Sequence, residues 1–280
     1  LKPFRPGGFC RRPFFVRNVM AKLSPLFSSS SGNCFYYASG GSAVLVDAGV
    51  SCKQILTALA QRSIAPESIG AVFITHSHDD HVKGLRVLLN RLKVPVLASA
   101  PTLQTLRQKQ ILTPEQGLDI TKAQSLPLAF GVQLFATSHD CPGSGGYVFT
   151  PENGEKTAIC TDLGEVTETV RQAILGCKTV VIESNHDVGM LQNGSYPYPL
   201  KQRILSNQGH LSNGCCATEL PGLVRAGARE IILAHLSKEN NTPQLAEITA
   251  VSVLTESGLQ RNSDYRLQVA PPSGGPVLYI

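Results

Sequence analysis

The chain has 280 residues, of which 42% are hydrophobic and 16% charged, a composition that is typical of a folded globular protein and excludes a disordered one. The net charge of +5 arises in residues 1–20, which hold five basic residues and no acid. In the rest of the chain 20 basic residues balance 20 acidic ones, and this balance excludes a uniformly basic surface. No apolar run approaches the roughly 20 residues of a transmembrane helix, so we expect no membrane partner.

Residues 1–20 are basic, contain proline and phenylalanine, and lack the apolar run of a secretory signal. We expect a disordered N-terminal extension here, with Met20 as the true start and one domain over residues 21–280. A transit peptide and a nucleic-acid-binding arm stay open as alternatives. The eight cysteines form no Cys-x-x-Cys pair, so we expect free thiols and a cytoplasmic protein.

The body opens with a strand-like segment, residues 22–27, and a loop of small residues, 28–33. Hydroxyls and free backbone amides on such a loop suit an oxyanion or a phosphate, so Ser31 and Asn33 are candidate substrate contacts. An ordinary flexible turn between two strands is the alternative, and the loop taken alone favours that interpretation.

Two apolar runs, 34–37 and 43–46, flank Gly40-Gly41 and predict a hairpin. The second strand ends at Asp47, a carboxylate placed to accept the second N–H of a metal-binding histidine in the next strand. Ser51 and Gln54 then have the pattern of a capping box, which predicts a helix.

The segment Thr75-His76-Ser77-His78-Asp79-Asp80-His81 directly follows an apolar run, 71–74, that predicts a buried strand. Histidine nitrogen and carboxylate oxygen are ligands that zinc, manganese and iron accept. His76 and His78 are two residues apart and point to one side of an extended backbone, whereas Asp80 and His81 can face a second ion. A solvated loop that carries histidines by accident is the alternative, and this spacing is rare by chance.

Helices and strands alternate after this cluster, with a helical face over 85–92, a strand over 94–98 and a helix that opens at Pro101. This alternation predicts an α/β fold. Four further strand-like runs each lead to a histidine or an acid, namely 131–136 to His139, 157–160 to Asp162, 178–182 to Glu183, and 230–234 to His235. Such strand ends are expected to converge on one site.

The segment between the last two of these strands holds further candidates. Lys201 and Arg203 lie in a short predicted helix, 199–205, and are candidate contacts to backbone phosphates, with a solvated helix face as the alternative. His186 either lines the rim of the site and holds a phosphate or is a buried histidine bonded to the backbone.

The C-terminal part of the chain predicts two helices and an edge strand. Residues 215–226 favour a helix that Pro221-Gly222 kinks or splits. Thr242-Pro243 predicts the start of a last helix, and 264–269 predicts an edge strand.

These residues resemble the metallo-β-lactamase superfamily, whose five signature positions match Asp47, the cluster from His76 to His81, His139, Asp162 and His235 in that order. The resemblance implies an α/β fold of the four-layer αββα sandwich type with the site at one edge. It also implies two divalent ions, zinc or manganese. The ligand set that it implies is His76, His78 and His139 for one ion and Asp80, His81 and His235 for the other, with Asp162 bridging.

Within the superfamily, residues 30–33, 183–187, 196–201 and 209–213 are similar to the WalJ/YycJ group, which is described as acting as a 5′→3′ exonuclease on double-stranded DNA. Glu183, His210 and His235 are also similar to ribonuclease Z, where a Glu–His pair beside the metals supplies a proton. The chain departs from these relatives, because the stretches before and after Asp162 are too short for the ribonuclease Z arm and for the inserted β-CASP domain.

The resemblance therefore implies a phosphodiester hydrolase whose partner is double-stranded DNA. His210 is the expected general acid, Glu183 orients it and keeps it charged, and Asp80 is included among the catalytic residues. Hydrolysis of small phosphodiesters, thioesters or lactones by the same metal centre stays open, as does a non-catalytic metal-binding module. A steep loss of affinity for DNA as the salt concentration rises would distinguish a DNA enzyme from these alternatives. The sequence determines neither the native metal nor the oligomeric state.

Overall fold

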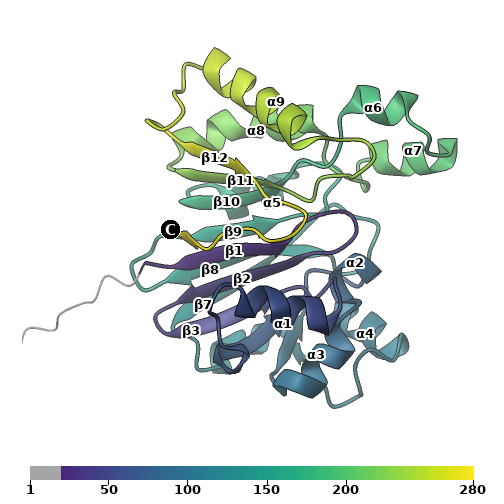
Figure 1. Cartoon of the computed structure of the whole chain (residues 1–280), viewed down its shortest axis with the longest axis vertical. Helices are drawn as coiled ribbons and strands as arrows, with labels where there is room; N and C mark the ends of the chain where they lie inside the picture. The colour runs from purple at the N-terminus through teal and green to yellow at the C-terminus, as the bar shows by residue number, and fades with distance from the viewer. Residues whose placement is uncertain (1–19) are drawn as a thin grey trace, which may run out of the picture.

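The computed structural model describes residues 20–280, so the predicted N-terminal extension, apart from Met20, lies outside the described residues. Two mixed β-sheets face each other, and helices cover the outer face of each sheet (Figure 1). Three apolar cores separate the layers, one between the sheets and one under each set of helices. The arrangement confirms the prediction of a four-layer αββα sandwich.

The first sheet has the strand order β13-β1-β2-β3-β4-β5-β6. Its strands are β1 (Lys22–Phe27), β2 (Cys34–Ser39), β3 (Ser42–Val46), β4 (Ile69–Phe73), β5 (Val96–Ala98), β6 (Leu118–Asp119) and β13 (Leu278–Tyr279). β2 and β3 form the predicted antiparallel hairpin, and Gly40 and Gly41 at its turn both have positive φ, which glycine adopts without steric cost. From β3 to β6 the strands are parallel, so their carboxyl ends meet at one edge.

The second sheet has the strand order β12-β11-β10-β9-β8-β7. Its strands are β7 (Phe130–Ala136), β8 (Gly145–Pro151), β9 (Thr157–Cys160), β10 (Thr179–Glu183), β11 (Glu230–Ala234) and β12 (Arg266–Val269). From β9 to β12 the strands are parallel, and β12 is an edge strand as predicted. The loops that leave β9, β10 and β11 therefore leave the same edge of this sheet.

The helices fall into two sets and one projecting pair (Figure 1). The first sheet carries α1 (Cys52–Ala60), α2 (Asp79–Val82), α3 (Leu85–Leu92), α4 (Ala100–Gln108) and the 3-10 turns η1 (Pro66–Ser68) and η2 (Ile120–Ser125). The second sheet carries α5 (Glu168–Ile174), α8 (Asn213–Arg225) and α9 (Pro243–Glu256), and the projecting pair is α6 (Val188–Asn193) and α7 (Tyr198–Leu205). Among residues 20–280, no helix combines the length and the hydrophobicity needed to cross a bilayer.

The core between the sheets fixes the distance between the strand that leads to the histidine cluster and the second sheet. Tyr37 of β2 stacks on Phe149 of β8 with ring centroids 4.5 Å apart, and both rings are fully buried. Burial of such a side chain stabilises the fold by about 1.5–3 kcal/mol. Tyr147 of β8 also donates a hydrogen bond of 2.7 Å to the carbonyl of Ile74, directly before the histidine cluster. The second sheet is thus tied to the strand that carries the cluster.

One prediction for the C-terminal part was wrong in part. Pro221 was expected to kink or split the helix, but α8 runs unbroken from Asn213 to Arg225 with Pro221 inside it. Leu220, Leu223 and Val224 are buried in the core under α8. Their burial offsets the roughly 3 kcal/mol that a proline costs inside a helix.

Candidate metal centre

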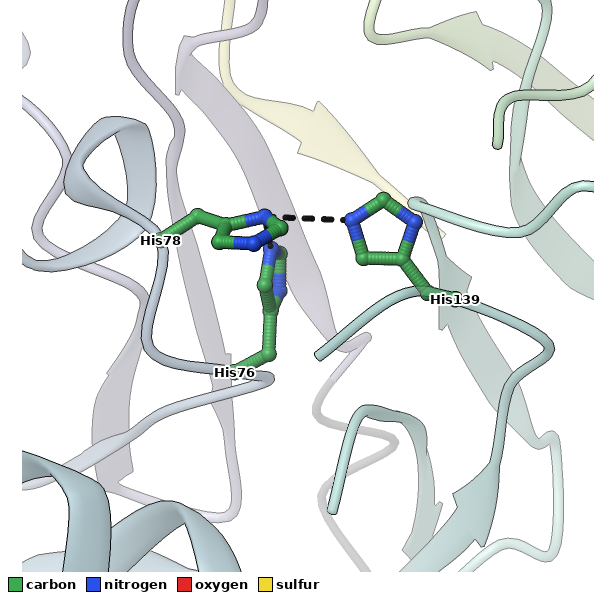
Figure 2. A group of neighbouring side chains, drawn as sticks. All are labelled: His76, His78 and His139. Atoms are coloured by element: carbon green, nitrogen blue, oxygen red, sulfur yellow. Dashed lines mark hydrogen bonds between the residues drawn. The ribbon is translucent and has the colours of Figure 1, made fainter. Parts of the chain in front are cut away.

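Three histidine side chains converge from two different loops (Figure 2). His76 and His78 follow β4, and His139 follows β7 of the other sheet. His78 Nδ1 lies 3.1 Å from His76 Nε2 and 3.1 Å from His139 Nε2. Nitrogens that share one tetrahedral zinc ion at about 2.0–2.1 Å lie about 3.3 Å apart, so this group fits a single ion.

A second group lies beside the first and consists of Asp80, His81, Asp162 and His235. His81 Nε2 is 3.2 Å from Asp162 Oδ2, and His235 Nε2 is 3.5 Å from Asp162 Oδ1. Asp162 Oδ2 and His235 Nε2 are buried and have no hydrogen-bond partner among the described residues. Unpaired buried polar atoms are costly, and a cation bound between them would satisfy both. The residues present therefore fit a metal ion here as well.

Asp162 lies between the two groups. Its Oδ1 is 3.9 Å from His76 Nε2 and 3.8 Å from His139 Nε2, in addition to its approach to His235. Burial alone would raise the pKa of Asp162, but the surrounding imidazoles, foremost His235, hold that pKa well below its usual range. An ionised carboxylate at this position can be shared by cations on both sides.

The second ring nitrogen of the clustered histidines is held by neighbouring groups. His81 Nδ1 is 2.8 Å from Asp47 Oδ2, His139 Nδ1 is 3.0 Å from the Gly209 carbonyl, and His235 Nδ1 is 3.2 Å from Asn33 Oδ1. Oxygen acceptors at Nδ1 fix the tautomer in which Nε2 carries the free lone pair. Asp47 thus lies at the position that the sequence predicted for it.

Three residues at this edge share an uncommon backbone conformation. Asp47, Asp162 and His235 follow β3, β9 and β11, and all three have left-handed backbone with φ of 64°, 60° and 57°. Few non-glycine residues adopt this region, and those that do cluster at functional sites. The loops also approach closely, because a Cβ on Gly49 would lie 1.6 Å from the Asp80 carbonyl oxygen.

Glu183 and His210 form a pair next to both groups. His210 Nδ1 is 2.9 Å from Glu183 Oε1, and Glu183 Oε2 accepts the backbone N–H groups of Leu163 and Leu211 at 3.0 and 3.1 Å. Glu183 is completely buried, whereas His210 is partly exposed. Burial lowers the pKa of His210, but the charge and hydrogen bond of Glu183 outweigh it and raise that pKa to about 9.

An open cavity of about 420 Å³ gives access to these groups, and His78, Asp80, Asp162, His210 and His235 line it. Arg203, predicted to contact substrate, also lines the cavity, where its Nη2 lies 2.9 Å from Asp140 Oδ1. Ser31 is exposed but does not line the cavity, whereas its neighbour Ser30 does.

The other predicted substrate contacts lie away from the cavity wall. Asn33 is completely buried behind the histidines, where its Nδ2 donates to the Ser29 carbonyl at 3.0 Å, so it positions His235 and does not face the cavity. His186 is buried, and neither of its ring nitrogens has a partner among the described residues. Lys201 donates to the Gln192 carbonyl at 2.8 Å.

Sequence reasoning missed Lys109 and Asp140 in the cavity region, and within the predicted serine loop it chose Ser31 where Ser30 lines the cavity. Asp140 Oδ1 lies 3.6 Å from His139 Nε2 and 3.8 Å from His78 Nε2, and its place directly after His139 was an available signal. Lys109 lines the cavity from the end of α4, and no local pattern marks it.

Comparison with known proteins finds a matching family model and two similar proteins. A family model described as "Beta-lactamase superfamily domain" matches residues 42–236. The chain is 34% identical to exodeoxyribonuclease WalJ of Streptococcus pneumoniae, over 92% of this chain and 98% of that protein. It is also 34% identical to exodeoxyribonuclease YycJ of Bacillus anthracis, over 89% of this chain and 95% of that protein.

Solved structures share the fold. The metallo-β-lactamase fold protein YhfI of Bacillus subtilis superimposes with a TM-score of 0.66 at 17% identity, covering 92% of this chain and 99% of that one. A likeness at this identity concerns the fold alone, whereas the family match and the two homologues above cover most of the sequence. The chain therefore belongs to the metallo-β-lactamase superfamily of metal-dependent hydrolases and is homologous to the WalJ and YycJ exodeoxyribonucleases.

Proposed function

We propose that this protein is an exonuclease that degrades double-stranded DNA from the 5′ end. The observation that carries the proposal is homology to two exodeoxyribonucleases over nearly the whole length of each chain. The Glu183–His210 pair beside the histidine and aspartate groups supports it, because phosphodiester cleavage needs a proton donor for the leaving oxygen.

The metal centre in this proposal holds two divalent ions, zinc or manganese. His76, His78 and His139 would hold one ion, Asp80, His81 and His235 would hold the other, and Asp162 would bridge them. Ions at these places supply Lewis-acid activation of water and of the phosphate oxygens. The buried unpaired atoms of Asp162 and His235 are the support from this structure for the second site.

His210 acts as the general acid in this scheme. Its Nδ1 is engaged by Glu183, so its Nε2 is left to donate a proton to the leaving oxygen. Glu183 accepts two backbone N–H bonds besides its bond to His210, so the carboxylate is fixed and in turn fixes the ring. Arg203 on the cavity wall is suited to a backbone phosphate, because a guanidinium binds phosphate oxygens in a fork.

The experiment is digestion of duplex DNA labelled at the 5′ or the 3′ end, with the protein reconstituted with zinc or manganese. Progressive release from the 5′ end, lost in the Asp162→Ala variant, is the expected result. Cleavage of bis-p-nitrophenyl phosphate with intact DNA would contradict the exonuclease and indicate a small phosphodiester as substrate. If neither is cleaved, the phosphodiester assignment fails and thioesters and lactones become the substrates to assay.

A further inference from the structure

We propose that Lys109 binds a backbone phosphate of the DNA substrate next to the phosphate that reacts, and thereby positions the strand over the metal centre. The inference rests on the proposed function and adds to it a residue that acts on substrate position. It is carried by the place of Lys109 in the cavity, by its unused hydrogen-bond donors, and by the distribution of charge on the cavity wall.

The ammonium group of Lys109 is fixed directly beside the first histidine group. Lys109 Nζ donates a hydrogen bond of 2.7 Å to the carbonyl of Ser77, the residue between His76 and His78. The side chain also lines the cavity together with His78. A cation at this place lies next to the groups that would hold the reacting phosphate.

The ammonium group retains donors for a ligand. A lysine ammonium has three N–H donors, and Ser77 takes one of them. Among the described residues the carboxylate paired with it is Asp79, at 3.9 Å, and the Asp79 side chain is 90% exposed. An exposed pair at this distance contributes little, so a phosphate oxygen can displace it.

α4 also fixes the position of Lys109 relative to the loop that follows His139. Lys109 is the C-terminal cap of α4, and Ser99 is the N-terminal cap. Ser99 Oγ donates to the Gly143 carbonyl at 2.8 Å, and Gly143 lies four residues after His139. The contact is close, since a Cβ on Gly143 would lie 2.3 Å from Ser99 Oγ and its φ is +76°. The helix is therefore tied at one end to the loop after His139 and at the other to the loop of His76.

The charges on the cavity wall leave a role for such a cation. The wall carries three carboxylates, of which Asp80 and Asp162 would hold metal ions in the proposed function, and the third, Asp79, is an exposed side chain that Lys109 faces. Besides His210, the cationic side chains among the lining residues are Lys109 and Arg203. They come from the end of α4 and from α7, which lie on opposite sides of α2 (Figure 1). Arg203 is paired with the Asp140 carboxylate through Nε and Nη2, whereas the hydrogen bond of Lys109 goes to a neutral carbonyl, which leaves its charge for a phosphate. A strand that crosses the site from α4 to α7 would contact both.

The test compares Lys109→Gln and Lys109→Arg with a matched control, Lys122→Gln, which removes an exposed lysine in η2 that does not line the cavity. Binding of a short fluorescein-labelled duplex to metal-loaded protein is measured over a range of salt concentrations in the His210→Ala background, which limits turnover. We expect Lys109→Gln to weaken binding about tenfold, as for a lost hydrogen bond to a charged group. The slope of log affinity against log salt should fall by about 0.9, while Lys109→Arg and Lys122→Gln keep the slope of the parent.

A structural role for Lys109 gives a different result. If the residue only holds Ser77 in place, Lys109→Gln changes metal content or overall affinity without changing the salt slope, and that outcome overturns the inference. An unchanged affinity and slope in Lys109→Gln overturns it too, while the exonuclease proposal stands as long as the wild-type protein cleaves duplex. A wild-type protein that neither binds nor cleaves duplex overturns the proposed function and the inference together.

Discussion

Asp47→Asn should weaken the binding of one metal ion selectively while the chain stays folded. Asp47 Oδ1 accepts the Thr75 N–H at 2.9 Å, and Oδ2 lies 2.8 Å from His81 Nδ1. Asparagine has a single oxygen, so the variant side chain, if it keeps the bond to the Thr75 N–H, turns its NH₂ group toward His81 Nδ1–H. Two donors then face each other in a site where the residue at position 47 is 1% exposed. The conflict is relieved if the His81 proton moves to Nε2, which removes the lone pair that would bind the ion.

The expected loss follows from the chemistry of the bond. Removing the partner of a metal-binding histidine weakens metal binding about 10- to 100-fold, which corresponds to about 1.4–2.8 kcal/mol. The loss should fall on the site of His81, since the group of His76, His78 and His139 makes no direct contact with Asp47 among the hydrogen bonds of the described residues. One ion per chain should therefore bind as in the wild-type protein and the other more weakly.

The assay is a competition titration of zinc against a chromophoric chelator, with thermal unfolding measured on the same samples. Asp119→Asn is the matched control, because Asp119 also accepts a backbone N–H, that of Thr121, but contacts no histidine among the described residues. Wild-type affinity for both ions in Asp47→Asn would refute the tautomer argument. Equal weakening of both ions with lower unfolding temperature would also refute it, since it would show that Asp47 acts on the fold and not on His81.

Three further changes test other parts of the site. His210→Ala should lower kcat on duplex DNA at least about 100-fold with metal content unchanged, and unaltered turnover would exclude His210 as the general acid. Asp162→Ala should leave fewer than two ions per chain in elemental analysis, and a variant that keeps two would contradict the bridge. Burial lowers the pKa of His186 to about 4, below the value near 6.5 of the unfolded chain, so the unfolded state gains a proton first as the pH falls. The free energy of unfolding should therefore fall from about pH 6.5 toward pH 4, by up to about 3 kcal/mol for this group. In His186→Leu this contribution is absent, so the free energy of unfolding measured with denaturant should depend less on pH over that range. Equal slopes in the two proteins would contradict the burial of a neutral His186.

The fold could be predicted because local sequence patterns indicate its strands and turns. The alternation of apolar strands and helical faces indicated an α/β class, and Gly40-Gly41 marked the hairpin of β2 and β3. The strands that lead to Asp162 and His235 both pair in parallel with β10 in the second sheet, so their carboxyl ends necessarily share an edge. That a cluster of ligand-type residues meets at this edge follows from the same rule.

The parts that sequence reasoning missed depend on contacts between distant segments. Asn33 was expected to face substrate, but the loop folds under the site and the side chain meets His235, which is 202 residues away. The salt bridge between Asp140 and Arg203 joins the loop after β7 to α7, across 63 residues of sequence, and Lys109 meets Ser77 only because α4 ends beside the cluster. Local periodicity carries no information about any of these three contacts.

The loop before His210 links the candidate proton donor to the metal centre. His139 Nδ1 is held by the Gly209 carbonyl, and the Asp140 N–H donates to the Gln208 carbonyl at 3.0 Å. The same short loop therefore orients a histidine of the first group and presents His210 to the cavity. Its path leaves no room for a side chain at position 209, where a Cβ would lie 2.2 Å from the Arg203 carbonyl oxygen. One glycine-containing turn after α7 thus positions both the proposed general acid and a histidine of the group formed by His76, His78 and His139.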